Sequence, residues 1–266
     1  MHLITWNLNK RRAIEPQVAA LIDRQPDVIA LQEVSVRNLP RLREAFAAVG
    51  YPYALDSVHA DPMPRRPFVM LVSRHSLQQL DAPVLPFQQA YVSALVDMSY
   101  GQVAVHNLHV PSIGAYEMEL KLRFMEGLYA HLAQPSALPR VVCGDFNSPA
   151  AELPDGTLIT FSQRLRANGS YGIVRGWDRW DRAERHLLEG LRPFDLHDAY
   201  RTLHGYAVSE ASWGARNKGR FFGFRLDHVL ASSHFQPMHV TYLHAWREQN
   251  LSDHSALDSV LFMRIS

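Results

Sequence analysis

The chain has 266 residues, 47% of them hydrophobic, which is enough for a large core and close to the length at which chains divide into domains. Lysine and arginine number 27 against 26 aspartate and glutamate, so net charge alone identifies no polyanionic partner, and any nucleic-acid contact must be local. The single cysteine, Cys143, excludes an internal disulfide, and its apolar neighbours predict that it is buried.

Short apolar runs predict a series of strands, and apolar residues at helical spacing predict helices between some of them. In the helix predicted after the second strand, Leu39, Leu42 and Phe46 share one face and Gly50 is placed as the C-terminal cap. The predicted strands cover residues 2–8, 27–34, 67–73, 92–98, 102–110, 140–147, 225–232 and 255–263, and the helices cover 15–26, 37–50 and 115–132.

Strands that come in pairs, with helices between some of them, favour an α/β fold of two packed sheets with helices outside over a simple alternating parallel fold. Residues 148–190 contain many prolines and glycines and have the least regular pattern. We expect this stretch to be a long excursion over the surface.

Several strands change from apolar to polar side chains along one face. Because side chains alternate along a strand, Val141, Cys143, Asp145 and Asn147 are predicted to share a face. If such strand ends meet at one rim, they assemble carboxylates, amides and imidazoles suited to a hard divalent cation and an oxyanion substrate. The same gradient occurs in Leu3, Thr5, Asn7 and Asn9; in Ile29, Leu31 and Glu33; in Val103, Val105, Asn107 and His109; and in reverse in Arg225, Asp227, Val229 and Ala231.

Asp253 and His254 are adjacent just before the last predicted strand. Neighbouring side chains on an extended segment point in different directions, so the two residues are not expected to perform the same task. One interpretation is a metal ligand beside a histidine that contacts phosphate or transfers a proton, and the other is a solvated surface pair.

The ordered motifs TWNLN, LQEV, NLHVP, GDFN, RLDHVLAS and SDHS resemble those of the endonuclease/exonuclease/phosphatase superfamily. The match spans nearly the whole chain, which implies one domain over residues 1–266 with a four-layered α/β sandwich fold. The segments SWGARNKGRFFGFRLDHVLAS and RAERHLLEGLRPFDLHDAYRTLHG look most like the exonuclease III and AP endonuclease branch.

The resemblance implies a Mg²⁺ site, in which Mn²⁺ can substitute for Mg²⁺. Three residues of the chain would lie at or near the metal. Glu33 would be the principal carboxylate ligand, Asn7 would belong to the same site, and Asp253 would lie near the ion. Asn9 stands where that branch usually has aspartate, so we expect one metal rather than two.

The same resemblance implies catalytic roles that fit phosphodiester hydrolysis without a covalent nucleophile. Asp145 would position or deprotonate the attacking water, and Asn147 and His254 would contact the scissile phosphate. Asp227 would orient His254, because a carboxylate bonded to one imidazole nitrogen fixes the tautomer and favours the charged form. His109 or the metal would assist the leaving oxygen.

Candidate substrate-binding residues are Asn107, Trp213, Arg216 and Lys218. Trp213 is expected either to pack against an abasic sugar or base, or to anchor a loop as a buried aromatic. The basic clusters Lys10 to Arg12, Arg65 with Arg66, and Arg216 to Arg220 could contact backbone phosphates, or they could be ordinary surface charge.

The first functional hypothesis is a Mg²⁺-dependent phosphodiesterase acting on DNA, as an endonuclease or exonuclease at abasic sites or 3′ ends. The alternative is a phosphatase or phosphodiesterase of a smaller substrate, such as an inositol phosphate, a phospholipid headgroup or a nucleotide metabolite. His109 permits this alternative, because the AP endonuclease branch has tyrosine there. A catalytically silent binding module is the third reading, and no obligate protein partner is inferred.

No run of about 18 apolar residues, the length that a membrane-spanning helix needs, occurs in the chain. The first residues contain no charged leader before an apolar stretch. We therefore expect a cytoplasmic protein without a membrane span.

Overall fold

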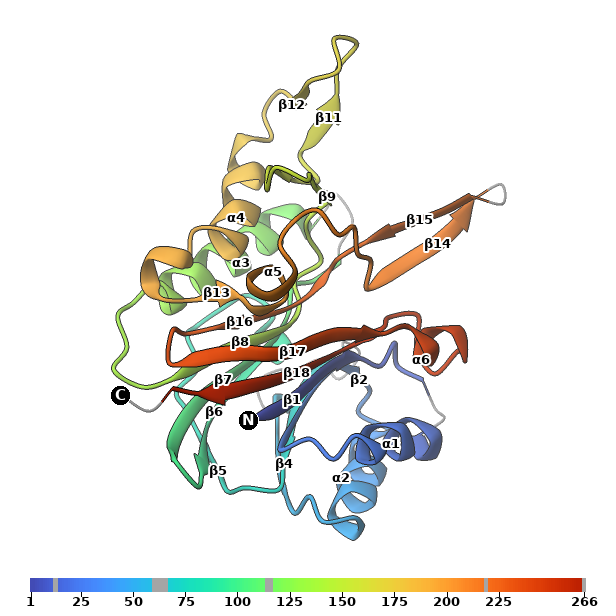
Figure 1. Cartoon of the computed structure of the whole chain (residues 1–266), viewed down its shortest axis with the longest axis vertical. Coiled ribbons are helices and arrows are strands. Elements are labelled where there is room, and N and C mark those ends of the chain that lie inside the picture. Colours follow the sequence, from blue (N-terminus) through green and yellow to red (C-terminus); the bar gives the residue numbers. More distant parts are fainter. Residues whose placement is uncertain (12–13, 59–66, 113–116, 218–219, 265–266) are drawn as a thin grey trace.

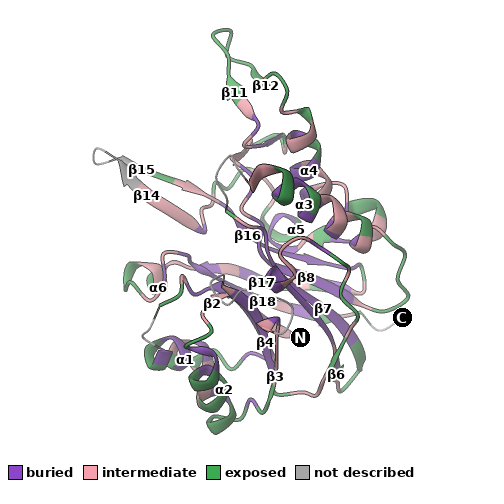
Figure 2. Ribbon diagram, turned by 180° about the vertical axis from the view of Figure 1, so that it is seen from behind, coloured by how far each residue is buried: buried purple, intermediate pink, exposed green. Residues whose placement is uncertain are grey.

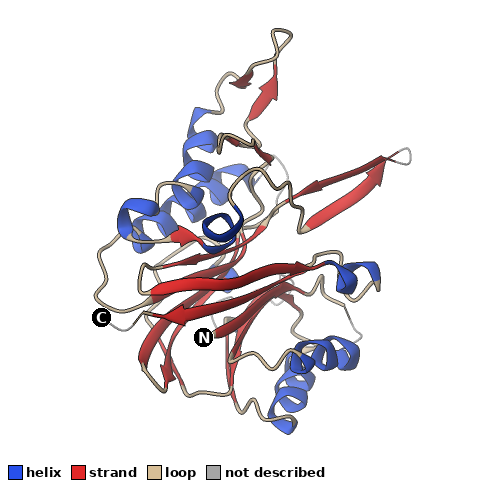
Figure 3. Ribbon diagram, in the orientation of Figure 1, coloured by secondary structure: helices blue, strands red, loops and turns tan. Residues whose placement is uncertain are grey.

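A computed structural model describes residues 1–11, 14–58, 67–112, 117–217 and 220–264. Within residues 216–221 it describes no side chains. Two six-stranded sheets pack face to face, and helices cover their outer faces (Figures 1 and 3). The first sheet has the order β17 (Phe235–Leu243), β18 (Ala256–Met263), β1 (His2–Asn7), β2 (Val28–Val34), β4 (Phe68–Ser73) and β3 (Tyr53–Asp56). The second has the order β13 (His197–Asp198), β16 (Asp227–Ala231), β8 (Arg140–Asp145), β7 (Gly101–His109), β6 (Tyr91–Met98) and β5 (Leu77–Gln79).

Each sheet has one parallel pair, β1 with β2 and β7 with β8, and its other pairs are antiparallel. Helices α1 (Ile14–Asp23) and α2 (Leu39–Ala48) cover the first sheet, while α3 (Met118–Leu132) and α4 (Asp178–Leu188) cover the second (Figure 1). Two short helices, α5 (Ala199–His204) and α6 (His244–Glu248), complete the helical elements used below. The predicted four-layered α/β sandwich is therefore confirmed.

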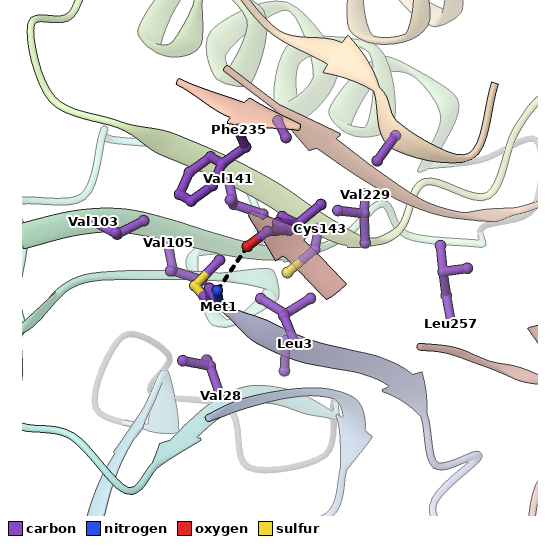
Figure 4. Packing of buried hydrophobic residues seen from close by; sticks show 14 of the residues in the cluster. Met1, Leu3, Val28, Val103, Val105, Val141, Cys143, Val229, Phe235 and Leu257 are labelled. Atoms are coloured by element: carbon purple, nitrogen blue, oxygen red, sulfur yellow. Dashed lines mark hydrogen bonds between the residues drawn. The ribbon is translucent and has the colours of Figure 1, made fainter. Parts of the chain in front are cut away.

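Alternating side chains divide the core into three apolar layers. The central layer lies between the sheets and includes Leu3, Val141, Cys143 and Val229 (Figure 4). The odd-numbered residues of β1 face this layer, whereas Ile4 and its even-numbered neighbours pack under α1 and α2. The third apolar layer lies between the second sheet and the helices α3 and α4. Buried residues are concentrated in the strands of both sheets (Figure 2). Cys143 is fully buried as predicted, and burial raises the pKa of its thiol to about 12.

Strand β17 is an element that the sequence pattern does not predict. It is an edge strand with mixed burial, and its pairing with β18 shifts register between Pro237 and His239. Proline lacks the backbone donor of a regular ladder and is tolerated in strands mainly at edges and bulges. A nine-residue strand is therefore compatible with a sequence that lacks a clean alternation.

The stretch 148–190 is only in part the expected excursion. It contains β9 (Ala151–Glu152) and β10 (Leu158–Ile159), followed by the hairpin of β11 (Gln163–Leu165) and β12 (Tyr171–Ile173), which projects from the sandwich (Figure 1). Its last part contains the whole of α4, which packs on α3 in the outer layer. A second projecting hairpin joins β14 (Trp213–Asn217) and β15 (Arg220–Phe224).

None of the helices in the described parts of the chain is long and apolar enough to cross a membrane.

Buried ion pairs fix the loop after β8 to the start of β16. Arg225, which is 4% exposed, donates hydrogen bonds to Glu152 and, at 2.6 Å, to Asp198. Arg201 of α5 donates to the same Glu152 carboxylate at 2.7 Å. His228 Nε2 lies 2.8 Å from the carbonyl oxygen of Ser148. This network holds the segment that follows the GDFN motif.

Replacement of Gly144 by alanine is expected to destabilise the fold strongly. Gly144 has φ of +136°, and a Cβ there would lie 1.9 Å from the carbonyl oxygen of Leu108 on the paired strand. We expect a loss of about 3 kcal/mol from strain and overpacking together, measured by urea unfolding. Gly101→Ala is the matched control, because Gly101 has φ of +123° but no atom within 4 Å of the added Cβ. Equal losses in both variants would contradict the role of the close approach.

Replacement of Glu152 by glutamine is expected to remove a pH-dependent part of the stability. Burial raises the pKa of Glu152, but the opposing effect of Arg225 and Arg201 is larger. The net result is a pKa lowered from 4.5 to about 2. A carboxyl group with a lowered pKa stabilises the fold at pH values above its pKa in the unfolded state. This contribution is lost as the pH falls from about 4.5 towards 2.

At neutral pH, Glu152→Gln leaves two buried cations without their shared partner, so we expect a loss of about 3 kcal/mol in chemical unfolding. The difference from the parent protein should shrink below pH about 4 as the parent's carboxylate becomes protonated. Glu119→Gln, at a surface partner of Arg179, is the control and should change stability little. A difference that is constant with pH would contradict the linkage.

Candidate active site

Polar side chains from both sheets meet where the central apolar layer ends. Asn7 ends β1, His109 ends β7, Asp145 ends β8 and Asp227 begins the antiparallel strand β16. Asp145 is paired in register with both His109 and Asp227. Asn7 reaches across the gap between the sheets, because its Nδ2 donates to Asp145 Oδ2 at 2.9 Å. The alternation in the sequence thus places these four side chains together as predicted.

Asp145 is the most enclosed carboxylate of this group, at 1% exposed. Its Oδ1 accepts a hydrogen bond from the backbone N–H of Asn147 at 2.8 Å, in addition to the bond from Asn7. Burial, followed by the nearby charge of Asp227, raises the pKa of Asp145, while His254 and His109 oppose the rise. Asp145 is therefore an oriented carboxylate with enhanced basicity.

His254 and Asp227 form a hydrogen-bonded pair beside Asp145. His254 Nδ1 lies 2.8 Å from Asp227 Oδ2, and its Nε2 lies 3.9 Å from Asp145 Oδ2. Burial lowers the pKa of His254, but Asp227 and Asp145 raise it more, to about 10. The imidazole is therefore held as a cation with Nε2 directed towards Asp145.

The surroundings of Asp227 hold it in place. The hydroxyl of Ser212 accepts hydrogen bonds from the backbone N–H groups of Leu226 and Asp227, and the Tyr242 hydroxyl donates to the Asp227 carbonyl at 2.6 Å. No sequence motif identifies Ser212 or Tyr242 as part of the site. Each residue contacts Asp227 from a segment that is distant in the sequence, which a local pattern does not show. Both residues position Asp227 for its bond to His254.

Glu33 reaches the site by a route that strand alternation does not predict. Regular alternation would place it with Ile29 and Leu31, which face α1 and α2. Instead Glu33 has φ of +51°, and the pairing of β2 with β4 shifts register between Leu31 and Val34. A bulge of this kind redirects a side chain. Glu33 Oε1 consequently lies 3.7 Å from His109 Nε2, and its Oε2 lies 3.4 Å from Lys10 Nζ.

His109 lies between the two carboxylates. Its Nε2 is 3.7 Å from Glu33 Oε1 and 3.7 Å from Asp145 Oδ2, and among the described residues this buried atom has no hydrogen-bond partner. A cleft of about 290 Å³ opens beside it, lined in part by Lys10, Glu33 and Gln89. The lining of this cleft therefore includes an imidazole with an unsatisfied nitrogen, which lies between the carboxylates of Glu33 and Asp145.

Within the described part of the chain, Asp145, Asp227 and His254 are placed to hold a metal ion. Each offers one ligand atom, and these atoms lie within 4.8 Å of one another. To bind a metal, His254 would have to lose the proton that Asp227 and Asp145 favour, because an imidazole coordinates only through an unprotonated nitrogen. Asp227 Oδ1 is buried without a hydrogen-bond partner among the described residues, and buried polar atoms of this kind are commonly satisfied by water or an ion. With Glu33 nearby, the oxygen-rich donor set fits a hard divalent cation.

This group differs from the metal residues expected from the resemblance. Asn7 is fully buried, and its Oδ1 accepts a hydrogen bond from the backbone N–H of Asn9 at 2.9 Å. Asp253 Oδ2 accepts a hydrogen bond from Trp213 Nε1 at 3.1 Å. Both residues border the site, but each amide or carboxylate already has a protein partner.

Asn147 lies next to Asp145 but is not on a continuing strand. Strand β8 ends at Asp145, and Asn147 has φ of +47°, so the predicted shared face does not extend to it. Its Nδ2 donates to the Val110 carbonyl at 2.7 Å and lies 3.5 Å from Asp145 Oδ2. The half-buried amide is thus fixed beside the carboxylate by its loop.

The prediction that Asn107 contacts substrate is wrong. Asn107 is fully buried, and its Nδ2 donates to the carbonyl oxygens of Leu31 and Met70 at 3.0 and 2.9 Å. Its Oδ1 accepts a hydrogen bond from Gln32 Nε2 at 2.7 Å. Strand alternation predicts the correct face but cannot show that the opposite sheet already binds the amide. Asn107 and Gln32 join the two sheets beneath the site.

Trp213 is half-buried at the base of the β14–β15 hairpin. Its ring stacks on Phe224 with centroids 6.1 Å apart and an interplanar angle of 12°, and its backbone forms a bridge with His254. Among the other predicted substrate-binding residues, Arg216 belongs to β14, but its side chain and the whole of Lys218 lie outside the described residues. Trp213 therefore connects this hairpin to His254 and its carboxylate partners, called the catalytic group below.

The basic clusters predicted from the sequence are described only in part. Lys10 lies at the cleft beside Glu33, and Arg11 is exposed. Arg12, Arg65 and Arg66 lie outside the described residues.

The fold is similar to solved structures across nearly its whole length. An AP endonuclease from Archaeoglobus fulgidus has a TM-score of 0.73 and 20% identity, with 100% of both chains covered. A 3′ phosphatase, NExo, from Neisseria, bound to a product DNA hairpin, has a TM-score of 0.66 and 19% identity, with 98% and 99% of the chains covered. D. rerio TDP2 with a single-strand DNA product has a TM-score of 0.66 and 16% identity, with 99% of both chains covered.

A search of curated proteins finds no match to the sequence. A family model described as the Endonuclease/Exonuclease/phosphatase family matches residues 4–254. This span includes the whole second sheet, the first sheet except β18 and the start of β1, and all the polar strand ends described above, from Asn7 to His254. The chain therefore belongs to the endonuclease/exonuclease/phosphatase family.

Proposed function

We propose that this protein is a Mg²⁺-dependent phosphodiesterase that acts on DNA through attack of water on phosphorus. Members of its family are phosphoric ester hydrolases that generally depend on a divalent metal. The observation that best supports the proposal is the buried Asp145 carboxylate beside the cationic His254, next to His109, which lines a cleft. A carboxylate of raised pKa and a fixed cation are suited to activating water and binding a phosphoryl oxygen.

In this proposal Asp145 accepts the proton of the attacking water. Its Oδ1 and Oδ2 are held by the Asn147 backbone and by Asn7, so the carboxylate keeps one orientation as it takes up the proton. Its raised pKa makes it a stronger base than an ordinary exposed aspartate.

His254 stabilises the negative charge that develops on the phosphoryl oxygens. Its Nδ1 is bound to Asp227, which leaves Nε2 to donate to a phosphoryl oxygen. Asn147 lies on the other side of Asp145 and contacts the same phosphate when its amide turns from Val110. His109 and Lys10 lie along the cleft and favour departure of the anionic oxygen.

Glu33 and Asn7 are the proposed metal residues, with Asp253 nearby, and Asp145, Asp227 and His254 are the alternative group. A bound Mg²⁺, or Mn²⁺ in its place, would polarise the phosphoryl oxygen and lower the pKa of water. The unpartnered Asp227 Oδ1 and His109 Nε2 are consistent with a polar or ionic occupant in this part of the site.

DNA is favoured as the substrate by the surroundings of the cleft. Trp213, Phe222 and Phe224 form a group of ring contacts at the β14–β15 hairpin, and aromatic rings stack with bases. Similar structures include one with a DNA hairpin product and one with a single-strand DNA product, which supports the same class of substrate. A smaller phosphorylated substrate is the second candidate, because the cleft of about 290 Å³ suits a single headgroup or nucleotide.

The substrate class is tested by incubating the purified protein with Mg²⁺ and a panel of substrates. The panel contains duplex DNA with an abasic site, nicked, single-stranded and intact DNA, and small phosphomonoesters. Cleavage of any DNA supports the proposal, and a loss in Trp213→Ala confined to abasic DNA would assign Trp213 to the sugar or base. Hydrolysis restricted to the small substrates, with every divalent cation tested, would refute it.

Asp145→Asn is expected to lower kcat by at least about 100-fold, because the variant loses the base that accepts the water proton. Asp227→Asn should also lower kcat, since His254 loses the carboxylate that fixes its tautomer. The measurement is steady-state hydrolysis of the best substrate, with thermal unfolding as the folding check. Asp23→Asn, on the exposed end of α1, is the control and should retain parental kcat. Normal turnover by Asp145→Asn would exclude the assigned base.

Chelation with EDTA is expected to abolish hydrolysis, and Mg²⁺ or Mn²⁺ should restore it. Binding is followed separately by the rise in Tm on titration with metal, because a ligand that binds the native state stabilises it. Glu33→Gln should weaken this Tm response together with kcat. An unchanged metal response in Glu33→Gln, with a lost response in Asp227→Asn, would move the metal to the alternative group.

A further inference from the structure

We propose that the β11–β12 hairpin and the pocket at its base form a second contact site for a nucleic-acid strand, outside the catalytic cleft. This inference rests on the proposed function, because it assumes that the strand's scissile phosphate lies beside Asp145. The hairpin, residues 163–173, is called the arm below. The tryptophan pocket at its base has a volume of about 230 Å³ and is lined by Met118, Leu122, Gly176, Trp177, Arg179 and Trp180.

The arm and its flanks have the charge that a phosphate backbone requires. From Gly156 to Trp177 the sequence contains no acidic residue and three arginines, Arg164, Arg166 and Arg175, all of them exposed. The whole chain has a formal net charge of only +1. Positive charge is therefore concentrated on this projecting segment, where arginines can pair with successive phosphates.

The base of the arm offers aromatic rings for stacking. Trp177 and Trp180 have centroids 5.0 Å apart, and the Arg164 guanidinium lies 5.3 Å from the Trp177 ring. Arg164 also donates to the carbonyl oxygens of Phe161 and Gln163 at 2.8 and 2.7 Å, which fixes its position. An indole beside a fixed cation is a favourable surface for a nucleobase.

One face of the arm is apolar although it is exposed. Leu165 and Tyr171 are cross-strand partners and are 63% and 38% exposed, and Ile173 is 36% exposed. A two-stranded hairpin has no core of its own in which to bury these side chains. Because side chains alternate along a strand, Arg164 lies on the opposite face, so the arm presents one apolar face and one basic face. Single strands are bound by stacking and by charge, and the two faces offer one of these each.

The arm is anchored to the outer layer at its base. Asp181 Oδ1 accepts a hydrogen bond from Thr160 Oγ1 at 2.7 Å and lies 3.3 Å from Ser162 Oγ, and the Phe161 N–H donates to Glu184 at 3.0 Å. A contact site on a fixed element loses little conformational entropy on binding.

The arm is connected to the catalytic group by a series of ring contacts. The Phe161 ring lies 5.2 Å from Phe224, which stacks on Trp213, and Trp213 is bonded to Asp253 beside His254. At the start of α3, Glu117 lines the catalytic cleft and the next residue, Met118, lines the tryptophan pocket. A strand that leaves the cleft at this side can therefore continue onto the arm.

The test measures binding apart from hydrolysis. Parent protein, the double variant R164E/R166E and Trp177→Ala are titrated in EDTA with a fluorescein-labelled single-stranded oligonucleotide, and affinity is read by anisotropy. We expect each variant to bind about tenfold more weakly. The slope of log affinity against log salt should fall by about 1.4 in R164E/R166E, for two lost phosphate contacts. With Mg²⁺, the loss on a long DNA substrate should appear in KM rather than in kcat.

Matched variants separate specific contacts from general charge and from misfolding. R164K/R166K and Trp177→Phe should recover most of the affinity. Arg264→Glu, which changes an exposed arginine at the opposite end of β18, should bind as the parent does. Circular dichroism and Tm verify that each variant is folded.

Two outcomes would overturn the inference. One is parental affinity and parental salt slope in both R164E/R166E and Trp177→Ala. The other is a changed oligomeric state of these variants with unchanged DNA affinity, which would assign the arm to a protein contact. If the parent binds DNA through the arm in EDTA but hydrolyses no DNA with any divalent cation, the proposed function fails while the second contact site remains.

Discussion

The burial of the Asp145 carboxylate between two sheets is the constraint on which the site depends. A carboxylate that is 1% exposed is costly unless both of its oxygens have partners. Asn7 comes from the first sheet, whereas the Asn147 backbone N–H and the His254 imidazole come from loops on either side of the gap. These partners reach Asp145 only if the sheets meet in one register. The carboxylate proposed as the base therefore also requires a specific alignment of the sandwich.

A polar layer beneath the site provides part of that alignment. Asn107 of the second sheet binds the carbonyl oxygens of Leu31 and Met70 in the first, and Gln32 donates to both Asn107 and Thr5. Apolar packing alone tolerates small shifts between sheets, whereas buried hydrogen bonds are satisfied in few arrangements. The transition from apolar core to bonded amides to carboxylates thus follows the strand direction and places the carboxylates above the bonded layer.

Strand periodicity predicted much of this fold and part of the site. The alternation along β7 and β8 correctly places His109 and Asp145 on the inner face, and the antiparallel pairing of β16 with β8 explains the reversed order noted for Asp227 and Val229. Prediction was incomplete where the backbone departs from regular strand alternation. This occurs at Glu33 and Asn147, which both have positive φ. It also failed where a distant segment decides a side chain's partner, since no local pattern shows that Asn107 is already bound by the opposite sheet.

The positive charge of the arm is a second feature that a local sequence pattern does not predict. The arginines of the arm are not a run in the sequence: Arg164 and Arg166 alternate with apolar residues, and Arg175 follows the second strand. They form one basic surface only when the hairpin folds. The residues proposed for chemistry lie at strand ends held by the two sheets, whereas these arginines lie on an element outside both sheets. The proposed contacts of the arm with a strand can therefore change without moving Asp145 or His254, whereas the β14–β15 hairpin is joined to His254 through Trp213.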